Sequence, residues 1–353
     1  MRTPTFILAA LCLTACTTQP ESPRRLSNPN ATPEARQLFA TLGQLYGQKT
    51  ISGAMADVNW NDAEPRLVHD ATGEWPEILG LDLIDVDYTD TTRHDGYYNP
   101  YTEFDFIKEH VSAGGIVTVG WHWSVPAAPD SSRLEFYTRT VFRTDSMLVA
   151  GTWENGVMER DLGLVVAQLR RFKEAGIPVL WRPLHEASGN RKSGGAEWFW
   201  WGNGGAKPYV ALWRHIYDRF RAEGLDNLIW VWTSQTGYGD DPSMGLLSDS
   251  TWYPGDEYVD IIGRDAYNRT AEQLADEFKA MEREHPGKML ALSECGTVGK
   301  LSEQWALGAR WSYFIPWYAH KATSLTGHIH ADADWWADAM TLPFVVKKGG
   351  LDL

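Results

Sequence analysis

Eight short apolar runs, separated by amphipathic stretches, constrain the fold of this chain more than any other feature. The runs are rich in Val, Ile, Leu and Trp, which is typical of strands that are buried on both faces of a parallel sheet. They cover residues 50–56, 78–86, 115–123, 178–186, 227–234, 259–267, 289–296 and 311–318. Helical spacing of apolar residues is clearest at 164–175, 209–222 and 271–284.

This alternation over roughly 320 residues predicts a (β/α)8 TIM barrel that forms a single domain at residues 33–353. A doubly wound sheet is the alternative, but it has fewer strands and a glycine-rich first turn. No G-x-G-x-x-G pattern follows the first run. Residues 124–160 are predicted to form a long loop at the mouth of the barrel, with a turn at 153–156, that lines a substrate cleft.

The first 32 residues do not have the composition of the barrel. Residues 1–15 contain an early Arg2 and a short apolar stretch that ends in Leu-Thr-Ala before Cys16, a pattern that resembles a bacterial lipobox. We interpret residues 1–15 as a signal peptide, Cys16 as the lipidation site and the polar, proline-rich residues 16–32 as a tether. The alternative is an ordinary signal peptide with an incidental cysteine. Thr17 favours sorting to the outer membrane, so we expect attachment to a bacterial membrane through the lipid anchor.

Composition narrows the class of ligand. The chain has 18 tryptophans, more than a core needs, and flat indole rings suit the apolar faces of sugars. Its formal net charge of −14 would repel a polyphosphate backbone, so we expect no nucleic-acid partner. Once the first 16 residues are set aside, Cys295 is the one cysteine left; it lies in an apolar run, where we expect a buried structural role.

Polar side chains close several of the predicted strands, and in a barrel this is where an active site forms. Glu186 ends the fourth run and Glu294 lies near the end of the seventh. Retaining glycosidases need two such carboxyl groups about 5–5.5 Å apart. One of them protonates the leaving oxygen while the other attacks the anomeric carbon, so the pair favours glycoside hydrolysis over the alternative of two solvated or salt-bridged glutamates.

Two longer motifs carry a family resemblance. The sequence Trp-Arg-Pro-Leu-His-Glu at 181–186, followed by Trp-Phe-Trp-Trp-Gly at 198–202, resembles the acid/base signature of glycoside hydrolase family 26. Leu-Ser-Glu at 292–294 is similar to the nucleophile strand of that family. The resemblance covers essentially the whole chain after residue 32. It implies an endo-β-1,4-mannanase that needs no cofactor and no metal, and we expect a monomer that acts on β-mannan.

The resemblance also implies roles for particular residues. Glu186 would be the general acid/base, with a pKa raised above about 4.3, and Glu294 the nucleophile. His122, His185 and Asp265 would line the sugar site, and Tyr267 would hydrogen-bond to the nucleophile. Trp198 and Trp317 would be aromatic platforms. Residues 187–197 depart from the family pattern by lengthening the link to Trp198.

Several alternatives stay open at this point. The same mechanism could act on mixed-linkage β-glucan or β-1,3-xylan, or the chain could be a non-catalytic carbohydrate-binding lipoprotein. His122 and His185 could be core residues, or could bind a metal together with Glu186. Asp265 and Arg182 could serve to organise the carboxylates, and Trp200 and Trp201 could be core residues instead of sugar platforms.

Overall fold

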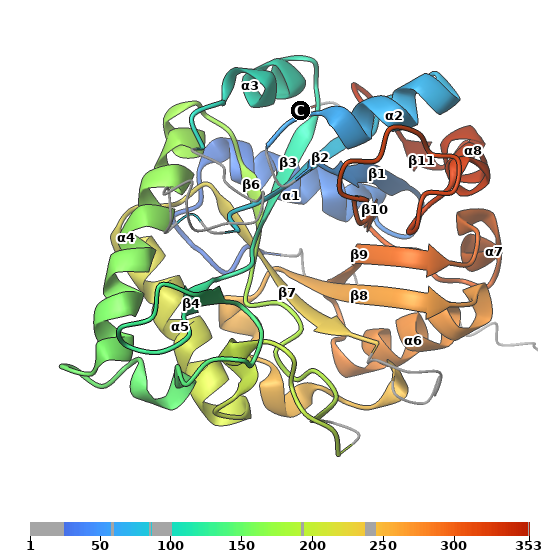
Figure 1. Cartoon of the computed structure of the whole chain (residues 1–353). Helices are drawn as coiled ribbons and strands as arrows, with labels where there is room; N and C mark the ends of the chain where they lie inside the picture. Colours follow the sequence, from blue (N-terminus) through green and yellow to red (C-terminus); the bar gives the residue numbers. More distant parts are fainter. Residues whose placement is uncertain are drawn as a thin grey trace, which may run out of the picture.

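A computed structural model describes residues 25–57, 60–84, 86, 101–191, 194–236, 245–351 and 353. The predicted signal peptide and Cys16 therefore lie outside the described residues. Eight parallel strands form the centre of the fold, with helices around the outside (Figure 1). The strands are β1 (Thr50–Met55), β2 (Ile78–Asp82), β3 (Ile116–Trp121), β6 (Val179–Pro183), β7 (Leu228–Gln235), β8 (Ile261–Arg269), β9 (Met289–Val298) and β10 (Tyr313–Pro316).

The sheet closes on itself, which confirms the TIM barrel. Each strand pairs in parallel with its neighbour in the order given, and β10 pairs with β1 through Ile51 opposite Tyr313 and Ser52 opposite Phe314. A doubly wound sheet would leave two open edges, so this alternative is excluded. The short strand β11 (Val345–Val346) adds to β1, and β4 (Val125–Pro126) with β5 (Leu134–Glu135) forms a separate hairpin.

Eight helices are described around these strands. They are α1 (Pro33–Leu45), α2 (Ala63–Thr72), α3 (Asp105–Ser112), α4 (Trp153–Glu174), α5 (Ala206–Ala222), α6 (Ala271–Glu284), α7 (Leu301–Ala306) and α8 (Ala333–Thr341). The helix predicted at 271–284 is confirmed to the residue, since Thr270 forms a capping box with Gln273. The turn predicted at 153–156 is wrong: Thr152 caps the backbone N–H of Asn155, and α4 begins at Trp153.

One end of the barrel is closed by α1. Side chains from all eight barrel strands, among them Ile51, Leu180 and Met289, form one buried apolar cluster with Leu38 and Phe39 of α1. Side chains from every strand can meet only inside the barrel. Its interior is therefore a packed core that α1 covers at the end where the strands begin.

The described end of the predicted tether is folded against this same end. The Asn28 side chain is buried and donates a hydrogen bond to Asp226 at 2.9 Å, and the backbone N–H of Ser27 donates to Asp260 at 2.5 Å. Both acceptors lie just before a barrel strand. The predicted tether boundary at residue 32 is therefore too late, and the folded domain includes residues 27–32. Among the described helices, none has both the length and the apolar composition needed to cross a membrane.

Candidate active site

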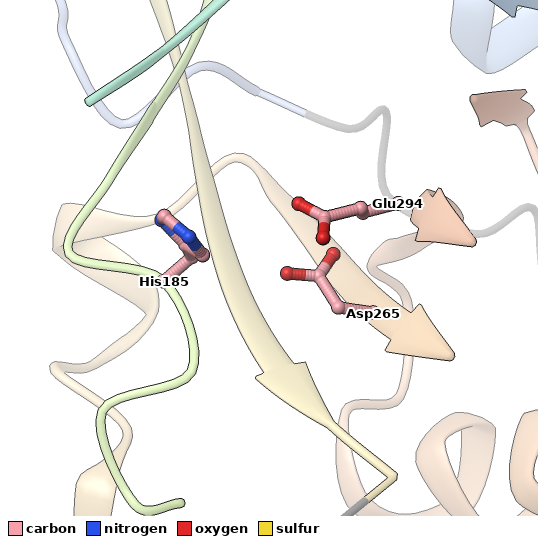
Figure 2. Close-up of side chains that lie close together, drawn as sticks. All are labelled: His185, Asp265 and Glu294. Atoms are coloured by element: carbon pink, nitrogen blue, oxygen red, sulfur yellow. The ribbon is translucent and has the colours of Figure 1, made fainter. Parts of the chain in front are cut away.

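Residues from β6 and the turn after it, from β8 and from β9 converge at the other end of the barrel, where the strands end. Figure 2 shows the carboxylates of Asp265 and Glu294 directed toward one another, with the ring of His185 to one side of them. One polar atom from each lies within 4.8 Å of the other two. Asp265 and Glu294 are paired neighbours on adjacent strands, where an irregularity after Gly263 shifts the register. The pairing brings two buried carboxylates together.

Arg182 is the buried cation that bonds to both carboxylates. Its guanidinium donates one hydrogen bond to Asp265 at 2.7 Å and another to Glu294 at 2.6 Å, and all three side chains are buried. Charge-assisted bonds of this kind fix both distance and orientation. The interpretation of Arg182 as an organiser of the carboxylates agrees with this geometry, and Asp265 has its structural role through Arg182 and through Ser293, which donates to it at 2.8 Å.

Glu294 also receives a hydrogen bond on its other oxygen. The Tyr267 hydroxyl donates to Oε1 of Glu294 at 2.5 Å, while Arg182 occupies Oε2. Burial and the nearby Glu294 raise the pKa of Tyr267 well above 10, so the phenol keeps its proton and remains a donor. Tyr267 thus lies where the family resemblance implied.

Glu186 lies in the turn just after β6, and the local backbone is unusual. Leu184 and Glu186 both have left-handed φ angles, near 49° and 55°, which cost free energy for residues with a side chain. Surrounding groups hold the turn: the Glu186 N–H donates to the Thr233 carbonyl at 3.1 Å, and the Trp201 indole donates to the carbonyl of His185 at 2.8 Å. The strain is therefore maintained at the position of the predicted acid.

The environment of Glu186 favours its protonated form. Burial is the largest cause, followed by the negative charges of Asp265 and Glu294, and together they raise the pKa of Glu186 well above its ordinary value. Trp198 and Arg182 act in the opposite direction, since the Trp198 indole donates to Oε2 of Glu186 at 2.7 Å. The predicted direction of the shift is confirmed, although burial and Asp265 act more strongly than Glu294.

The longer link before Trp198 is attached to the barrel at its beginning. Ser188 donates to Asp249 at 3.0 Å, and the Gln235 amide donates to Ser188 at 2.7 Å and to the Gly189 carbonyl at 2.6 Å. Arg191 and Glu197 form an ion pair across the link. The extra residues therefore leave Trp198 half-buried beside Glu186.

Two histidines form a chain of contacts at the edge of the site. His122, just after β3, has its Nδ1 atom 2.6 Å from Asp82, and its Nε2 atom is 3.1 Å from Nε2 of His185. Burial alone would lower the pKa of His122, but the Asp82 carboxylate raises it. Burial and the Arg182 charge lower the pKa of His185 well below 6.5, so we infer a neutral His185 beside His122. Trp317, half-buried after β10, has its ring centroid 5.6 Å from that of His122.

The metal alternative has a different set of residues from the one that the sequence suggested. Among the described residues, the group within reach of a single ion is His185, Asp265 and Glu294, not His122, His185 and Glu186. Both of its carboxylates already bond to Arg182, so a guanidinium supplies the positive charge there. This donor set fits an organised carboxylate pair better than an additional cation.

Other tryptophans at the mouth belong to the core. Trp200 and Trp201 are fully buried, and their indoles donate to the carbonyls of Trp123 and His185. Their interpretation as core residues is thus supported. Cys295 is buried next to Glu294, and burial raises the pKa of its thiol, which fits a structural role.

Sequence reasoning missed Asp82 and Phe199. Asp82 ends β2 inside a predicted apolar run, and a carboxylate at a strand end was the signal that could have identified it. Phe199 packs against the rings of His122 and His185 at 5.6 and 5.1 Å between centroids. Nothing in its sequence position separates it from the core tryptophans that follow.

Comparison of the sequence with known proteins finds a matching family and several relatives. Residues 27–343 match the family described as Glycosyl hydrolase family 26. A mannan endo-1,4-beta-mannosidase of Thermothelomyces thermophilus is 32% identical over 323 residues, which cover 88% of this chain and 61% of the relative. A protein of the same description from Bacillus subtilis is 28% identical, with coverage of 82% and 81%. The chain spans only about half to three fifths of the length of the first curated relatives that it matches.

Solved structures agree with the fold. The GH26 domain of an endo-beta-mannanase/endo-beta-glucanase from Prevotella bryantii superposes with a TM-score of 0.83 at 35% identity, and the match covers 93% of this chain and 99% of that domain. A beta-mannanase from a protist symbiont of the termite Reticulitermes speratus, complexed with a gluco-manno-oligosaccharide, gives 0.71 at 31% identity, with coverage of 92% and 97%.

Proposed function

Because the chain belongs to glycoside hydrolase family 26, we propose that it is a retaining endo-β-1,4-mannanase that cuts mannan, galactomannan or glucomannan by double displacement. The observation that carries this proposal is that two glutamates in one site have different surroundings. Arg182 and Tyr267 both donate hydrogen bonds to the Glu294 carboxylate and hold it in place, whereas burial and two carboxylates keep the proton on Glu186.

The proposed first step uses both groups at once. Glu294 attacks the anomeric carbon, and Glu186 gives its proton to the glycosidic oxygen as the bond to the leaving sugar breaks. The new glycosyl ester removes the negative charge of Glu294. One cause of the raised pKa of Glu186 then disappears, and Glu186 can accept a proton from the water that hydrolyses the ester.

The surrounding residues would hold the sugar. His122, fixed by Asp82, and His185 follow the ends of β3 and β6, where they can contact hydroxyl groups of the sugar at the cleavage point. Trp198 and Trp317 are half-buried and present ring surface as well as a fixed position. Asp265 would hold Arg182 in place and would not contact the substrate.

Removing each glutamate tests the two roles. Glu294→Ala should abolish turnover, since no ester can form, and azide should restore activity on an activated aryl glycoside with an inverted product. Glu186→Ala should retain the first step only for leaving groups that need no protonation. NMR of the anomeric protons identifies the product. Near-native activity of Glu294→Ala on mannan would show that the nucleophile lies elsewhere.

Product analysis separates the proposed substrate from the alternatives. Mannohexaose, linear mannan and galactomannan should be cut internally, and mixed-linkage β-glucan and β-1,3-xylan should not. The relatives described as mannan endo-1,4-beta-mannosidase support the first group. Cleavage of β-glucan alone would replace the proposed substrate, whereas binding without cleavage would support the non-catalytic alternative.

We also propose that the protein is a lipoprotein, attached through Cys16 to a bacterial outer membrane. The support is the Leu-Thr-Ala-Cys pattern at 13–16, after an apolar stretch too short to span a bilayer. The attachment would place the enzyme where extracellular polysaccharide or its fragments arrive.

A further inference from the structure

The segment between β10 and α8 carries a second group of histidines that the proposed mechanism does not use. It contains the sequence His-Ile-His at 328–330, and it begins with Trp317 at the mouth of the barrel. His330 is half-buried, and its ring makes no hydrogen bond to another residue in the described part of the chain. An imidazole without such a bond can still donate to or accept from a ligand.

Glu64, on α2, holds this segment in place from two sides. Its Oε1 atom accepts the backbone N–H of Ala319 at 2.9 Å, and its Oε2 atom is 3.2 Å from Nε2 of His328. Nδ1 of His328 accepts the N–H groups of His330 and Ala331 at 3.2 and 3.0 Å. Because Nδ1 accepts, the ring proton lies on Nε2 and points to Glu64. Both side chains are almost fully covered, at 2% exposure for His328 and 9% for Glu64.

A second set of bonds places His330 next to the nucleophile's tyrosine. The Thr297 N–H donates to the His330 carbonyl at 2.7 Å, which ties the segment to the end of β9. The His330 and Tyr267 rings meet edge to face with centroids 5.5 Å apart. Gly296 leaves just enough room, since a carbon added there would lie 2.4 Å from Nδ1 of His330 and 2.6 Å from the Tyr267 ring.

We propose that His330 binds a hydroxyl group of the sugar unit that adjoins the one attacked by Glu294, on the side that stays attached to the enzyme. This inference rests on the proposed function and extends it to one more subsite. The leaving sugar lies toward Glu186, which protonates its oxygen, after β6. His330 contacts the ends of β8 and β9 instead, beyond Tyr267, so it faces the part of the substrate that Glu294 retains.

Glu64 and His328 are positioning residues in this account. They fix the backbone of residues 328–331 so that the His330 ring is already ordered when substrate arrives, which lowers the entropy lost on binding. The design resembles the support of His122 by Asp82, in which a carboxylate and a hydrogen bond also set the direction of a histidine.

Two aryl glycosides with the same leaving group test the proposal. For His330→Ala we expect kcat/KM on an aryl β-mannobioside to fall about tenfold, the loss expected for one hydrogen bond, and to change little on the aryl β-mannoside, which has no adjoining sugar. His330→Gln should recover part of the loss because its amide can still bond to a hydroxyl group. The bonds cut in mannopentaose should also shift in His330→Ala. His215→Ala, on the outer helix α5, is the control and should match wild type.

Other results would overturn the proposal. An equal loss on both glycosides would show that His330 acts through Tyr267, and no loss on either would remove it from the site. Gly296→Ala, which pushes on both rings, is the reference for an effect through Tyr267 and should lower activity on both glycosides. If wild type prefers another β-linked glycan, the same pair of substrates is made with that sugar. The proposed substrate then fails, while the role of His330 is still decided.

Discussion

At the scale of single residues, the site depends on one buried cation among several buried carboxyl groups. Arg182 bonds to Asp265 and Glu294, and Glu186 lies close enough to sense all three charges. Removing one partner from such a network leaves an unpaired buried charge, which costs about 3–5 kcal/mol. Arg182 is therefore needed both for folding and for the position of Glu294, so its substitution alone would not separate the two effects.

At Glu186 an effect on stability can be measured apart from catalysis, because the pKa of Glu186 is raised in the folded protein. Below the pKa of the unfolded chain, about 4.3, both states hold the proton and the group has no effect on stability. As the pH rises from there through the folded-state pKa, the folded protein holds more protons than the unfolded chain, so its stability falls. Glu186→Gln copies the protonated form and should avoid this loss.

We therefore expect Glu186→Gln to match wild type in thermal unfolding near pH 4 and to be more stable at pH 8, although it cannot complete turnover. In Glu294→Gln, NMR titration should show a lower pKa for Glu186 that still exceeds its ordinary value, since burial and Asp265 remain. Equal stability of wild type and Glu186→Gln at every pH would contradict the raised pKa.

At the scale of strands and helices, the sequence pattern was sufficient for the barrel itself. All eight predicted strands are present, and the closing pair β10 and β1 follows from their number. Strand ends were less predictable. Glu186 lies in a left-handed turn after β6 instead of in the strand, because tertiary bonds to Thr233 and Trp201 override local preference.

The site was predictable where a motif named the residue and not where support comes from distant segments. Glu186, Glu294 and Tyr267 lie together as the family resemblance implied. Asp82 and Glu64 carry no motif, and their partners His122 and His328 lie 40 and 264 residues away in the sequence. The start of α4 was missed because a Trp-Glu-Asn-Gly sequence has turn character, whereas the Thr152 cap and buried Met158 favour a helix.

The tryptophan-rich segment after Glu186 combines two functions that substitution should separate. Trp201 is fully buried and donates to the His185 carbonyl, whereas Trp198 is half-buried and donates to Glu186. Trp201→Ala should lower the free energy of unfolding by about 3–5 kcal/mol, the usual cost of truncating a buried tryptophan. Trp198→Ala should cost much less stability but should lower kcat/KM. Urea denaturation and initial rates on one aryl glycoside measure both, and the reverse pattern would contradict these assignments.

At the scale of the whole molecule, the two ends of the barrel have separate tasks. The end where the strands begin is covered by α1 and by residues 27–32, while the carboxylates lie at the end where the strands finish. The chain thus enters the fold at the face opposite the site. Nine peptide units separate the proposed anchor Cys16 from Arg25, so the link spans at most about 30 Å when fully extended. A lipid at Cys16 would keep the closed end near the bilayer and direct the mouth away from it.

This arrangement predicts that anchoring and catalysis are independent. Cys16→Ala should move the protein from the membrane fraction to the soluble fraction. Its kcat/KM on soluble mannan should equal that of wild type within about twofold, since residues 27 and 28 join the fold at the end opposite the carboxylates. Metabolic labelling with a tagged fatty acid should mark wild type but not the variant. Cys295→Ala, a buried cysteine far along the chain, is the matched control and should keep both the label and the membrane location. Retention of Cys16→Ala in the membrane at wild-type levels would exclude the lipid anchor. A large change in its kcat/KM would mean instead that the mouth does not face away from the attachment point.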